Sequence, residues 1–459
     1  MDFPRDFTEY MRRRQEDYPL LEEALRAEAP VSIRLNPAKR ALPLRHERVK
    51  WCSTGYYLPE RPAFTFDPLF HAGVYYVQEA ASMFLEQAVA QYVTSPVVCL
   101  DLCAAPGGKS THLLSLLPRG SLLVSNEVIR SRANVLAENV LKWGWPEVAV
   151  TNSDPAALGR LTHGFDVLVA DLPCSGEGMF RKDPASRNAW SLANVKLCAA
   201  RQRRILHDVW PALKPGGICI YSTCTFNREE NEENIRYLAE RLPAEALPVS
   251  IEESWYITCG FDDRYPSYRF FPHRTKGEGF FLAVLRKPEE RHRPFSVPTG
   301  NRRPALRHTP GDEWLSDAGA YRFTAEASCV RAVPEMLAER LLSLTGRLRV
   351  VTAGIPVGEW KGKDFLPTPA LALSTAFRHD AFPTVELAWT DAVRYLQKEA
   401  PGLPPDTPKG YVTVTFRGTP LGFVKHLGHR ANNLYPHEWR IRSRHLPETE
   451  VTLPGAGQG

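Results

Sequence analysis

Short apolar segments alternate with helical segments between residues 97 and 286, and this alternation constrains the fold more than any other feature of the sequence. Strands that alternate with helices are typical of a doubly wound α/β sheet whose strands run parallel. Ligands bind such sheets at the carboxyl ends of the strands, so the loops that follow the strands are where chemistry is expected. The expected strands are Val97–Leu102, Leu122–Ser125, Val148–Thr151, Val167–Ala170, Ile218–Tyr221 and Phe280–Leu285. The expected helices are Lys109–Leu117, Ser131–Lys142, Val195–Leu213 and Glu229–Glu240.

Other patterns flank this α/β domain, for which we expect the bounds 96–286, because a chain of 459 residues is too long for one ordinary core. An amphipathic helix pattern over Phe7–Ala27 and a strand signal over Val31–Leu35 come first, and a helix pattern over Gln78–Tyr92 follows. They predict an α+β N-terminal domain over residues 1–95. Residues 287–312 are basic and rich in proline, which favours an extended linker.

Two small mixed α/β domains are expected after the linker, over residues 313–400 and 401–459. The expected helices there are Pro334–Leu344 and Thr390–Lys398, and the expected strands are Leu348–Thr352, Tyr411–Phe416 and Leu421–Lys425. A cluster of cations near the end of the chain is interrupted by a single acid, Glu438, and consists of Lys409, Arg417, Lys425, Arg430, Arg440, Arg442 and Arg444. Such a run of charges is usually no more than a solvent-exposed face, but Tyr435 and Trp439 lie within this one. Cations mixed with aromatic rings favour RNA binding.

Composition indicates where a chain of this kind works. The nine cysteines are odd in number and scattered, which is not a disulfide framework and fits a reducing compartment. The N-terminus has no apolar stretch with a cleavage site, and no segment approaches the length of a membrane span. The net charge of +5 says little by itself. We expect a cytoplasmic, monomeric protein without a membrane partner.

Three consecutive strand ends carry residues suited to a nucleoside ligand. The loop Asp101–Ser110 has small residues that allow close approach of a ligand, and it opens a helix whose first amides favour an anion. It matches neither the phosphate loop nor the dinucleotide fingerprint, and alone it could be an ordinary tight turn. Glu127 ends the next strand and could bind both ribose hydroxyls, and Asp154 follows the third strand and could meet an adenine amino group. Together they predict a nucleoside site.

Two thiols follow the fourth and fifth strands, beside this predicted site. Most free cysteines are small buried hydrophobes, but Cys174 and Cys224 lie in polar loops of small residues. Zinc binding and a dithiol redox pair are disfavoured because no two cysteines have the two-residue spacing of a knuckle, so we predict no metal site. Chemistry and spacing do not say which thiol would react.

A nucleoside ligand that carries a sulfonium methyl group, together with a thiol, fits one reaction well. Carbon 5 of a pyrimidine is too weak a nucleophile to attack a sulfonium methyl group, but addition of a thiolate to carbon 6 makes carbon 5 enamine-like. A carboxylate such as Asp171 could hold the cytosine edge at N3 and N4. Because a stacked base cannot be reached, it would be extruded into the pocket.

The loops Asp101–Ser110, Asp171–Gly178 and Ser222–Thr225 resemble, in this order, those of the Nol/Nop/Sun family of RNA cytosine-5 methyltransferases. The extended segment Asp171–Pro184 and the later Phe271–Arg274 and Gly277–Phe280 are most similar to the bacterial RsmF-like branch, which acts on small-subunit ribosomal RNA. The resemblance covers residues 1–286 well. It implies a Rossmann-like sheet that binds S-adenosylmethionine and a last domain that is PUA-like.

The resemblance also implies roles for single residues. Cys224 would be the nucleophile at carbon 6, Cys174 would assist release of the methylated RNA, and Asp171 would lie between cofactor and base. The residues implied to contact S-adenosylmethionine are Cys103, Ala104, Ala105, Pro106, Gly107, Gly108, Lys109, Glu127, Arg132, Asp154 and Asp171. The N-terminal motifs Arg34–Asn36 and Gln78-Glu79 would line the RNA side. Leu172 and Ser110 replace the usual Ala and Thr, which preserves size class or hydroxyl.

Two other functions compete with 5-methylcytosine formation. A ribosome-assembly factor could keep the fold and bind RNA without catalysis, but it would need neither thiol. A methyltransferase for a 2′-hydroxyl or a protein side chain would need a positioned base instead of two thiols.

Overall fold

A computed structural model of the protein describes residues 3–39, 44–242, 244–289, 309–443 and 445–453. The expected basic linker, residues 287–312, lies largely outside the described residues. Among the helices that are described, none has both the length and the apolar composition needed to cross a membrane.

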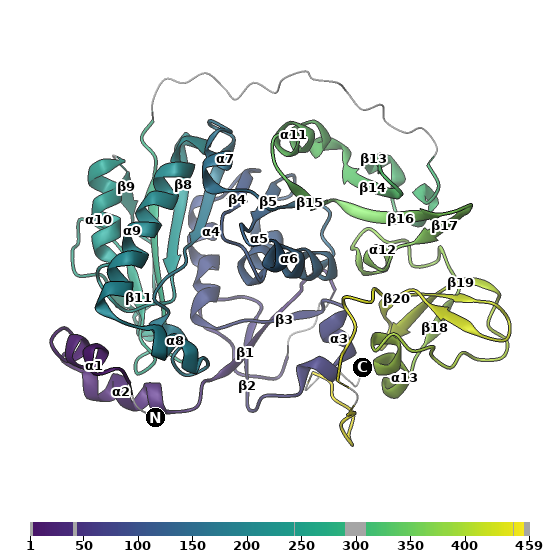
Figure 1. The fold of residues 1–459 in the computed structure, drawn as a ribbon, viewed down its shortest axis with the longest axis horizontal. Coiled ribbons are helices and arrows are strands. Elements are labelled where there is room, and N and C mark those ends of the chain that lie inside the picture. Colours follow the sequence, from purple (N-terminus) through teal and green to yellow (C-terminus); the bar gives the residue numbers. More distant parts are fainter. Residues whose placement is uncertain (1–2, 40–43, 243, 290–308, 444, 454–459) are drawn as a thin grey trace.

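One large sheet crosses the centre of the molecule and confirms the expected α/β fold (Figure 1). Five adjacent strands run parallel in the order β8-β7-β4-β5-β6. Their bounds are Val98–Asp101 (β4), Leu122–Asn126 (β5), Val148–Thr151 (β6), Phe165–Asp171 (β7) and Leu213–Thr223 (β8). The chain moves outward from β4 to β6 and then returns to the other side of β4 for β7. Ligands of doubly wound sheets bind at such a reversal of strand order.

The sheet differs from the expected parallel arrangement at the edge beyond β8. The expected strand Phe280–Leu285 is present as β12 (Phe280–Arg286), but it runs antiparallel to β8. The chain reaches β12 from its antiparallel neighbour β11 (Tyr268–Phe270) and not through a helical crossover, which parallel pairing would need. Two further short strands, β9 (Glu245–Leu247) and β10 (Thr258–Cys259), extend this edge.

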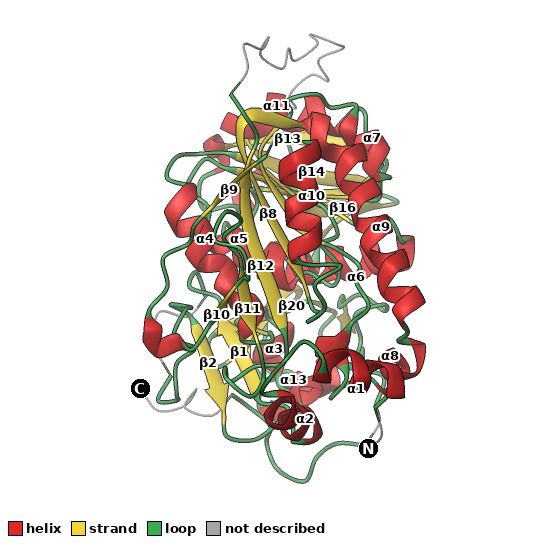
Figure 2. Cartoon of the chain, turned by 90° about the vertical axis from the view of Figure 1, so that its left-hand side faces the viewer, coloured by secondary structure: helices red, strands yellow, loops and turns green. Residues whose placement is uncertain are grey.

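Helices cover both faces of the sheet, because successive strand residues point to opposite sides. Cys99 packs with Val89, Leu113 and Leu136 on one face, whereas the neighbouring Leu100 belongs to the core on the other face. The first face carries α4 (Leu85–Tyr92), α5 (Gly108–Leu116) and α6 (Arg130–Trp143). The opposite face carries α7 (Pro155–Gly159), α9 (Leu192–Val209) and α10 (Glu232–Arg241), and Figure 2 shows α9 and α10 standing beside β8. A short helix, α8 (Pro184–Ala189), precedes α9.

The N-terminal region is interrupted more often than its sequence pattern indicates. The expected helix over 7–27 is two helices, α1 (Arg5–Arg12) and α2 (Tyr18–Arg26), because Pro19 in the first turn of α2 cannot lie inside a longer helix. The expected strand is confirmed as β1 (Val31–Leu35), between β2 (Gly55–Leu58) and β3 (Tyr75–Val77). A four-residue helix, α3 (Pro68–His71), precedes β3, and the helix expected from residue 78 begins at Leu85 as α4.

The first C-terminal segment is not independent of the central sheet. Its own sheet contains β13 (Tyr321–Glu326), β14 (Cys329–Pro334), β16 (Ile355–Lys361) and β17 (Asp364–Pro367), with helices α11 (Glu335–Thr345) and α12 (Pro369–Leu373). However, β15 (Val350–Ala353) leaves that sheet and pairs antiparallel with β6. Leu337 and Leu341 of α11 pack in the core under the central sheet. The pairing covers an edge strand whose backbone groups would otherwise lack partners.

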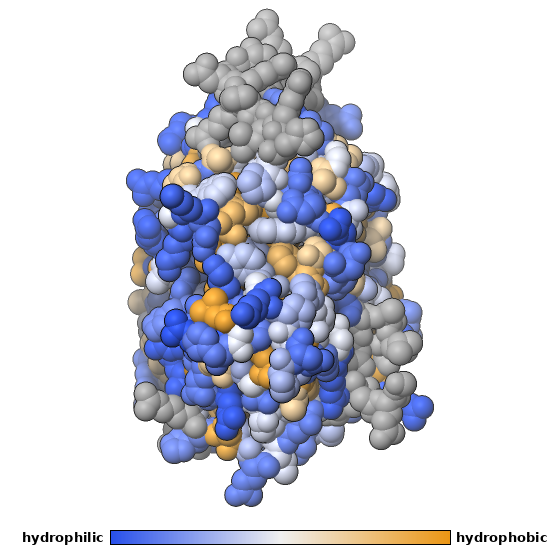
Figure 3. Space-filling view, turned by 90° about the vertical axis from the view of Figure 1, so that its right-hand side faces the viewer, coloured by the Kyte–Doolittle hydropathy of each residue, from blue (hydrophilic) through white to orange (hydrophobic). Residues whose placement is uncertain are grey.

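The last sheet begins before the boundary expected at residue 401. It contains β18 (Thr384–Glu386), β19 (Gly410–Phe416), β20 (Thr419–His426) and β21 (Ala431–Asn433), and helix α13 (Trp389–Leu396) packs on it. Trp389 Nε1 donates to the carbonyl of Phe66, 3.0 Å away, so this sheet is docked on the N-terminal region. Figure 3 views the molecule from the C-terminal side and shows a mainly hydrophilic surface with separate apolar spots.

Candidate active site

Two cysteines, fifty residues apart in the chain, face each other at the carboxyl ends of neighbouring strands. Cys174 follows β7, Cys224 follows β8, and their sulfur atoms are 3.1 Å apart. The hydrogen bond with Cys224, followed by burial, raises the pKa of Cys174 well above its usual range. The backbone N–H of Gly178 donates to the carbonyl of Cys224 at 2.9 Å, which ties the two loops together. The parallel pairing of β7 with β8 therefore creates a thiol pair.

Lys109 and Asp171 form an ion pair beside the thiols. Lys109 Nζ lies 2.8 Å from Asp171 Oδ2, and Ser222 Oγ donates to the other carboxylate oxygen at 2.8 Å. The Lys109 side chain is 13% exposed and lies over the ring of Phe280, 5.1 Å from its centroid. Burial alone would lower the pKa of Lys109, but the Asp171 carboxylate outweighs this effect and the net shift is upward. The ammonium therefore stays charged where the sequence predicted a cofactor contact.

Two buried glutamates hold the thiol loops in place, and sequence reasoning gave neither a role. Glu177 Oε2 accepts hydrogen bonds from the backbone N–H groups of Phe226 and Asn227, at 2.6 and 2.9 Å, and Oε1 accepts from Trp190 Nε1 at 2.9 Å. Glu230 accepts from the N–H of Ser175 and from Gln202 Nε2. Burial raises the pKa of Glu230 to about 7. Glu177 lies inside the motif Asp171–Gly178. An acid between two glycines is the sequence feature that could have indicated its role.

We expect Glu177→Gln to destabilise the protein by about 3 kcal/mol, because an amide nitrogen would face N–H donors that now bond to a buried carboxylate. Urea denaturation followed by circular dichroism measures this loss. Glu60→Gln, at an exposed position, is the matched control and should leave the midpoint unchanged. Equal midpoints for the two variants would show that Glu177 does not support the loop.

Glu127, Arg132 and the glycine loop, which were predicted to form a nucleoside site, lie next to one another in the structure. Arg132 Nη1 lies 3.3 Å from Glu127 Oε2, and Nη2 donates to the carbonyl of Ala105 at 2.9 Å. Glu127 is 2% exposed, and its Oε1 accepts from the N–H of Ile129. Apart from this ion-pair contact with Arg132, Oε2 accepts no hydrogen bond within the described residues. A buried carboxylate oxygen with spare capacity at a strand end fits a ribose hydroxyl.

The remaining loop residues form the turn from β4 into α5. The N–H of Ala104 donates to the carbonyl of Asn126 at 2.8 Å, which fixes the loop against the end of β5. Gly107 has φ = 117°, a conformation that favours glycine, and α5 begins at Gly108. Cys103 and Pro106 lie in the same turn. Ser110 Oγ donates to Asp101 Oδ2 at 2.7 Å, and burial raises the pKa of Asp101 to about 7.

Three predicted residues have a structural role in the folded protein. Asp154 caps α7, because its Oδ1 accepts from the N–H of Ala156 at 2.9 Å. Arg34 is fully buried and donates to Gln78 Oε1 and Thr111 Oγ1, at 2.8 and 2.7 Å. Asn36 is also buried and donates to the carbonyls of Gly73 and Trp143. Arg34 and Asn36 thus join the N-terminal sheet to α5 and α6 and do not face solvent.

Comparison with known families accounts for most of the chain. Residues 93–286 match the family described as 16S rRNA methyltransferase RsmB/F. Residues 3–80 match the N-terminal domain of 16S rRNA methyltransferase RsmF, and residues 382–441 match the methyltransferase RsmF PUA domain. The last match confirms the expected PUA-like domain at the C-terminal end.

Individual relatives extend over nearly the whole chain. The sequence is 32% identical over 427 residues to ribosomal RNA small subunit methyltransferase F of Cronobacter sakazakii, which covers 85% of this chain and 84% of that protein. It is 30% identical over 409 residues to the protein of the same name from Shewanella woodyi, with 85% and 84% covered. The crystal structure of a methyltransferase homolog from Pyrococcus horikoshii superposes with a TM-score of 0.52 at 27% identity, covering 61% of this chain and 93% of that one. The chain therefore belongs to the ribosomal RNA small subunit methyltransferase F family.

Proposed function

We propose that this protein methylates carbon 5 of a cytosine in small-subunit ribosomal RNA and that Cys224 forms the covalent bond to carbon 6. As a member of a methyltransferase family with a Rossmann-like sheet, it uses S-adenosylmethionine as methyl donor. The observation that carries the proposal is the pair of sulfur atoms 3.1 Å apart, next to the ion pair of Lys109 and Asp171. Methyl transfer to oxygen or nitrogen has no use for such a pair.

The carboxyl ends of β4 and β5 fit the cofactor. Glu127 would accept hydrogen bonds from the ribose hydroxyls, since its buried Oε2 has capacity to accept them. Arg132 would hold that carboxylate and the loop carbonyl of Ala105 in place. The small residues Cys103–Gly108 would allow close approach of the donor, and Asp154 would lie at the adenine side. When bound, the cofactor supplies an electrophilic methyl group.

The contacts around the two sulfur atoms support Cys224 as the nucleophile. The raised pKa keeps Cys174 in its neutral thiol form, which can donate a hydrogen bond to the sulfur of Cys224. The Lys109 ammonium also interacts electrostatically with Cys224. A donated hydrogen bond and a nearby cation both stabilise a thiolate, and the thiolate is the reactive form of cysteine. Cys224 is therefore the sulfur better placed to attack.

The proposed covalent cycle balances without a further reactant. The Cys224 thiolate adds to carbon 6, which makes carbon 5 the nucleophile that accepts the methyl group. Transfer of the carbon-5 proton to solvent water then expels the Cys224 sulfur as a thiolate and restores the aromatic ring. Asp171 is one-third exposed and would accept a hydrogen bond from the cytosine N4 amino group. Cys174 would stabilise the departing thiolate as a hydrogen-bond donor.

RNA is the partner that the flanking regions would hold. The PUA match and the basic end of the chain support this, although two of its cations are paired with acids, Arg417 with Glu450 and Lys425 with Asp364. Arg444 lies outside the described residues. The charge contacts predict that binding weakens as salt is raised.

We expect Glu127→Gln to weaken S-adenosylmethionine binding about tenfold, because an amide accepts weaker hydrogen bonds than a carboxylate and offers one acceptor oxygen instead of two. Isothermal titration calorimetry on the full chain measures this directly. Glu240→Gln, at an exposed position on α10, is the control and should bind as the native protein does. A Glu127→Gln variant with native affinity would remove Glu127 from the proposed cofactor site.

The product test is bisulfite sequencing of small-subunit ribosomal RNA, with and without the gene, together with mass spectrometry of the nucleosides. We expect at least one cytosine to lose its protection from bisulfite conversion when the gene is absent. It should regain this protection when the RNA is incubated with the protein and S-adenosylmethionine. A non-catalytic assembly factor would bind RNA and leave every cytosine unchanged, and that result would contradict the proposal.

A further inference from the structure

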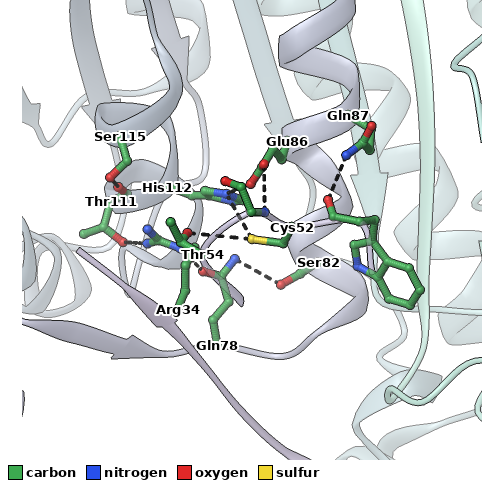
Figure 4. A network of polar contacts seen from close by, with 12 residues as sticks. Arg34, Cys52, Thr54, Gln78, Ser82, Glu86, Gln87, Thr111, His112 and Ser115 are labelled. Atoms are coloured by element: carbon green, nitrogen blue, oxygen red, sulfur yellow. Dashed lines mark hydrogen bonds and ion pairs between the residues drawn. The ribbon is translucent and has the colours of Figure 1, made fainter. Parts of the chain in front are cut away.

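Three buried side chains with metal-binding atoms meet away from the thiol pair, where the N-terminal region packs on the central sheet. Cys52 lies in the turn before β2, Glu86 in the first turn of α4, and His112 on α5. One potential ligand atom from each lies within 4.8 Å of those of the other two. Figure 4 shows Cys52 and Glu86 beside the His112 ring, and both make their contact to its Nε2 atom. None of the three has a part in the proposed methyl transfer.

We propose that Cys52, Glu86 and His112 bind a single zinc ion. The distances favour it: Cys52 Sγ lies 3.8 Å and Glu86 Oε2 lies 3.2 Å from His112 Nε2. Zinc–sulfur bonds of about 2.3 Å and zinc–nitrogen or zinc–oxygen bonds of about 2.0–2.2 Å at tetrahedral angles place such atoms roughly 3.4–3.6 Å apart. The mixed sulfur, nitrogen and oxygen set suits zinc and disfavours magnesium or calcium, which prefer oxygen alone.

The His112 ring has one nitrogen for a metal ion and one for its own proton, as a neutral imidazole ligand needs. No hydrogen bond is found for His112 Nδ1 among the described residues, so that nitrogen can carry the ring proton while Nε2 offers its lone pair. Binding would release the Cys52 thiol proton to solvent. The Cys52 thiolate and the Glu86 carboxylate would then balance the two charges of the ion, next to the Arg34 guanidinium.

One surface cavity of about 580 Å³ reaches two of the three proposed ligands. Its lining includes Cys52 and Glu86, together with Arg48, Lys50, Gln87 and Glu252. An ion would enter through this cavity, and water would take the fourth coordination position. Spacing rules missed this site because its three ligands come from separate segments and include only one cysteine.

A bound ion would link the N-terminal region to the methyltransferase region, with Glu86 lying between the two in the sequence. Cys52 belongs to the region that matches the N-terminal domain, and His112 belongs to the region that matches the methyltransferase domain. His112 also lies three residues after Lys109 on α5, so it shares a helix face with the lysine of the thiol site. We therefore expect zinc to stabilise the joint between the two regions and the orientation of α5.

The test uses the full chain, loaded with zinc, desalted and analysed by mass spectrometry for metals. We expect about one equivalent of zinc in the native protein and under about a tenth of an equivalent in Cys52→Ser and His112→Gln, because each loses one of three ligands. Cys259→Ser, at an exposed cysteine, is the matched control and should retain the ion. Zinc should also raise the Tm of the native protein but not that of Cys52→Ser.

X-ray absorption spectroscopy of the zinc-loaded native protein decides the question even if a variant fails to fold. One sulfur at about 2.3 Å with nitrogen and oxygen ligands at about 2.0–2.2 Å is expected for this site. Two sulfur ligands would assign the ion to Cys174 and Cys224 instead and overturn the proposal. Failure to retain zinc, or undiminished zinc in Cys52→Ser, would also overturn it and leave a hydrogen bond between His112 and Glu86 as the role of the cluster.

Discussion

Replacing Cys224 with alanine will reduce methyl transfer by about 10⁴-fold or more, because carbon 5 of cytosine is not activated without a sulfur bond at carbon 6. The variant should still fold, since the hydrogen bond of its sulfur goes to the Cys174 sulfur and the loop is held by Glu177 and Glu230. Incorporation of labelled methyl groups into small-subunit RNA measures the rate. A denaturing gel shows whether protein and RNA become covalently joined, and we expect no adduct.

Cys259→Ala is the matched control, because it also removes one sulfur but at an exposed position on β10. It should methylate at the native rate. If Cys224→Ala formed a covalent adduct with RNA, Cys174 would be the nucleophile, and the order of roles proposed for the two thiols would be reversed.

Replacing Cys174 with alanine will have the second large effect, and it will act on a later step. The first methyl transfer should proceed, but repeated turnover should fall by about 100-fold or more, the scale of a lost acid–base group. In the proposed cycle the Cys224 sulfur leaves as a thiolate, and the thiol donor 3.1 Å away would be gone. The variant should therefore accumulate a protein–RNA adduct that survives denaturation and depends on S-adenosylmethionine.

The double variant Cys174→Ala/Cys224→Ala separates this explanation from a general defect. It should form no adduct, since the accumulated species needs the Cys224 sulfur. A Cys174→Ala variant that turns over at the native rate without adduct would show that the two sulfurs, although close, do not act in sequence.

The central strands could be predicted because each is a short apolar segment bounded by loops and buried on both faces. That pattern is local, and β4 to β7 appear where it places them, whereas β8 begins at Leu213, which was expected to end the preceding helix. The direction of β12 could not be predicted in the same way, because it depends on how the chain returns from α10 through β11. Likewise, β15 has the pattern of any short strand, and nothing in its sequence names β6 as its partner.

The site was predictable at the level of loops and not at the level of contacts. Strand-end positions indicated that Cys174 and Cys224 would be neighbours, but the hydrogen bond between them and the burial that together raise the pKa of Cys174 appear only in the folded protein. The pairing of Lys109 with Asp171 joins residues from two loops, so only the folded sheet brings it about. Asp154 shows that one sequence position can have two explanations, because an acid after a strand is also the usual cap of the next helix.

The pairing of β15 with β6 also affects how the protein is made. Thr151 pairs with Val350, so β6 gains its outer partner only after a strand about 200 residues further along the chain has been synthesised. At roughly 5–20 residues per second, a ribosome needs about 10–40 s to synthesise that stretch. During this time β6 is an open edge, on which another nascent chain or a chaperone can pair. The catalytic sheet is therefore complete only when most of the protein has left the ribosome.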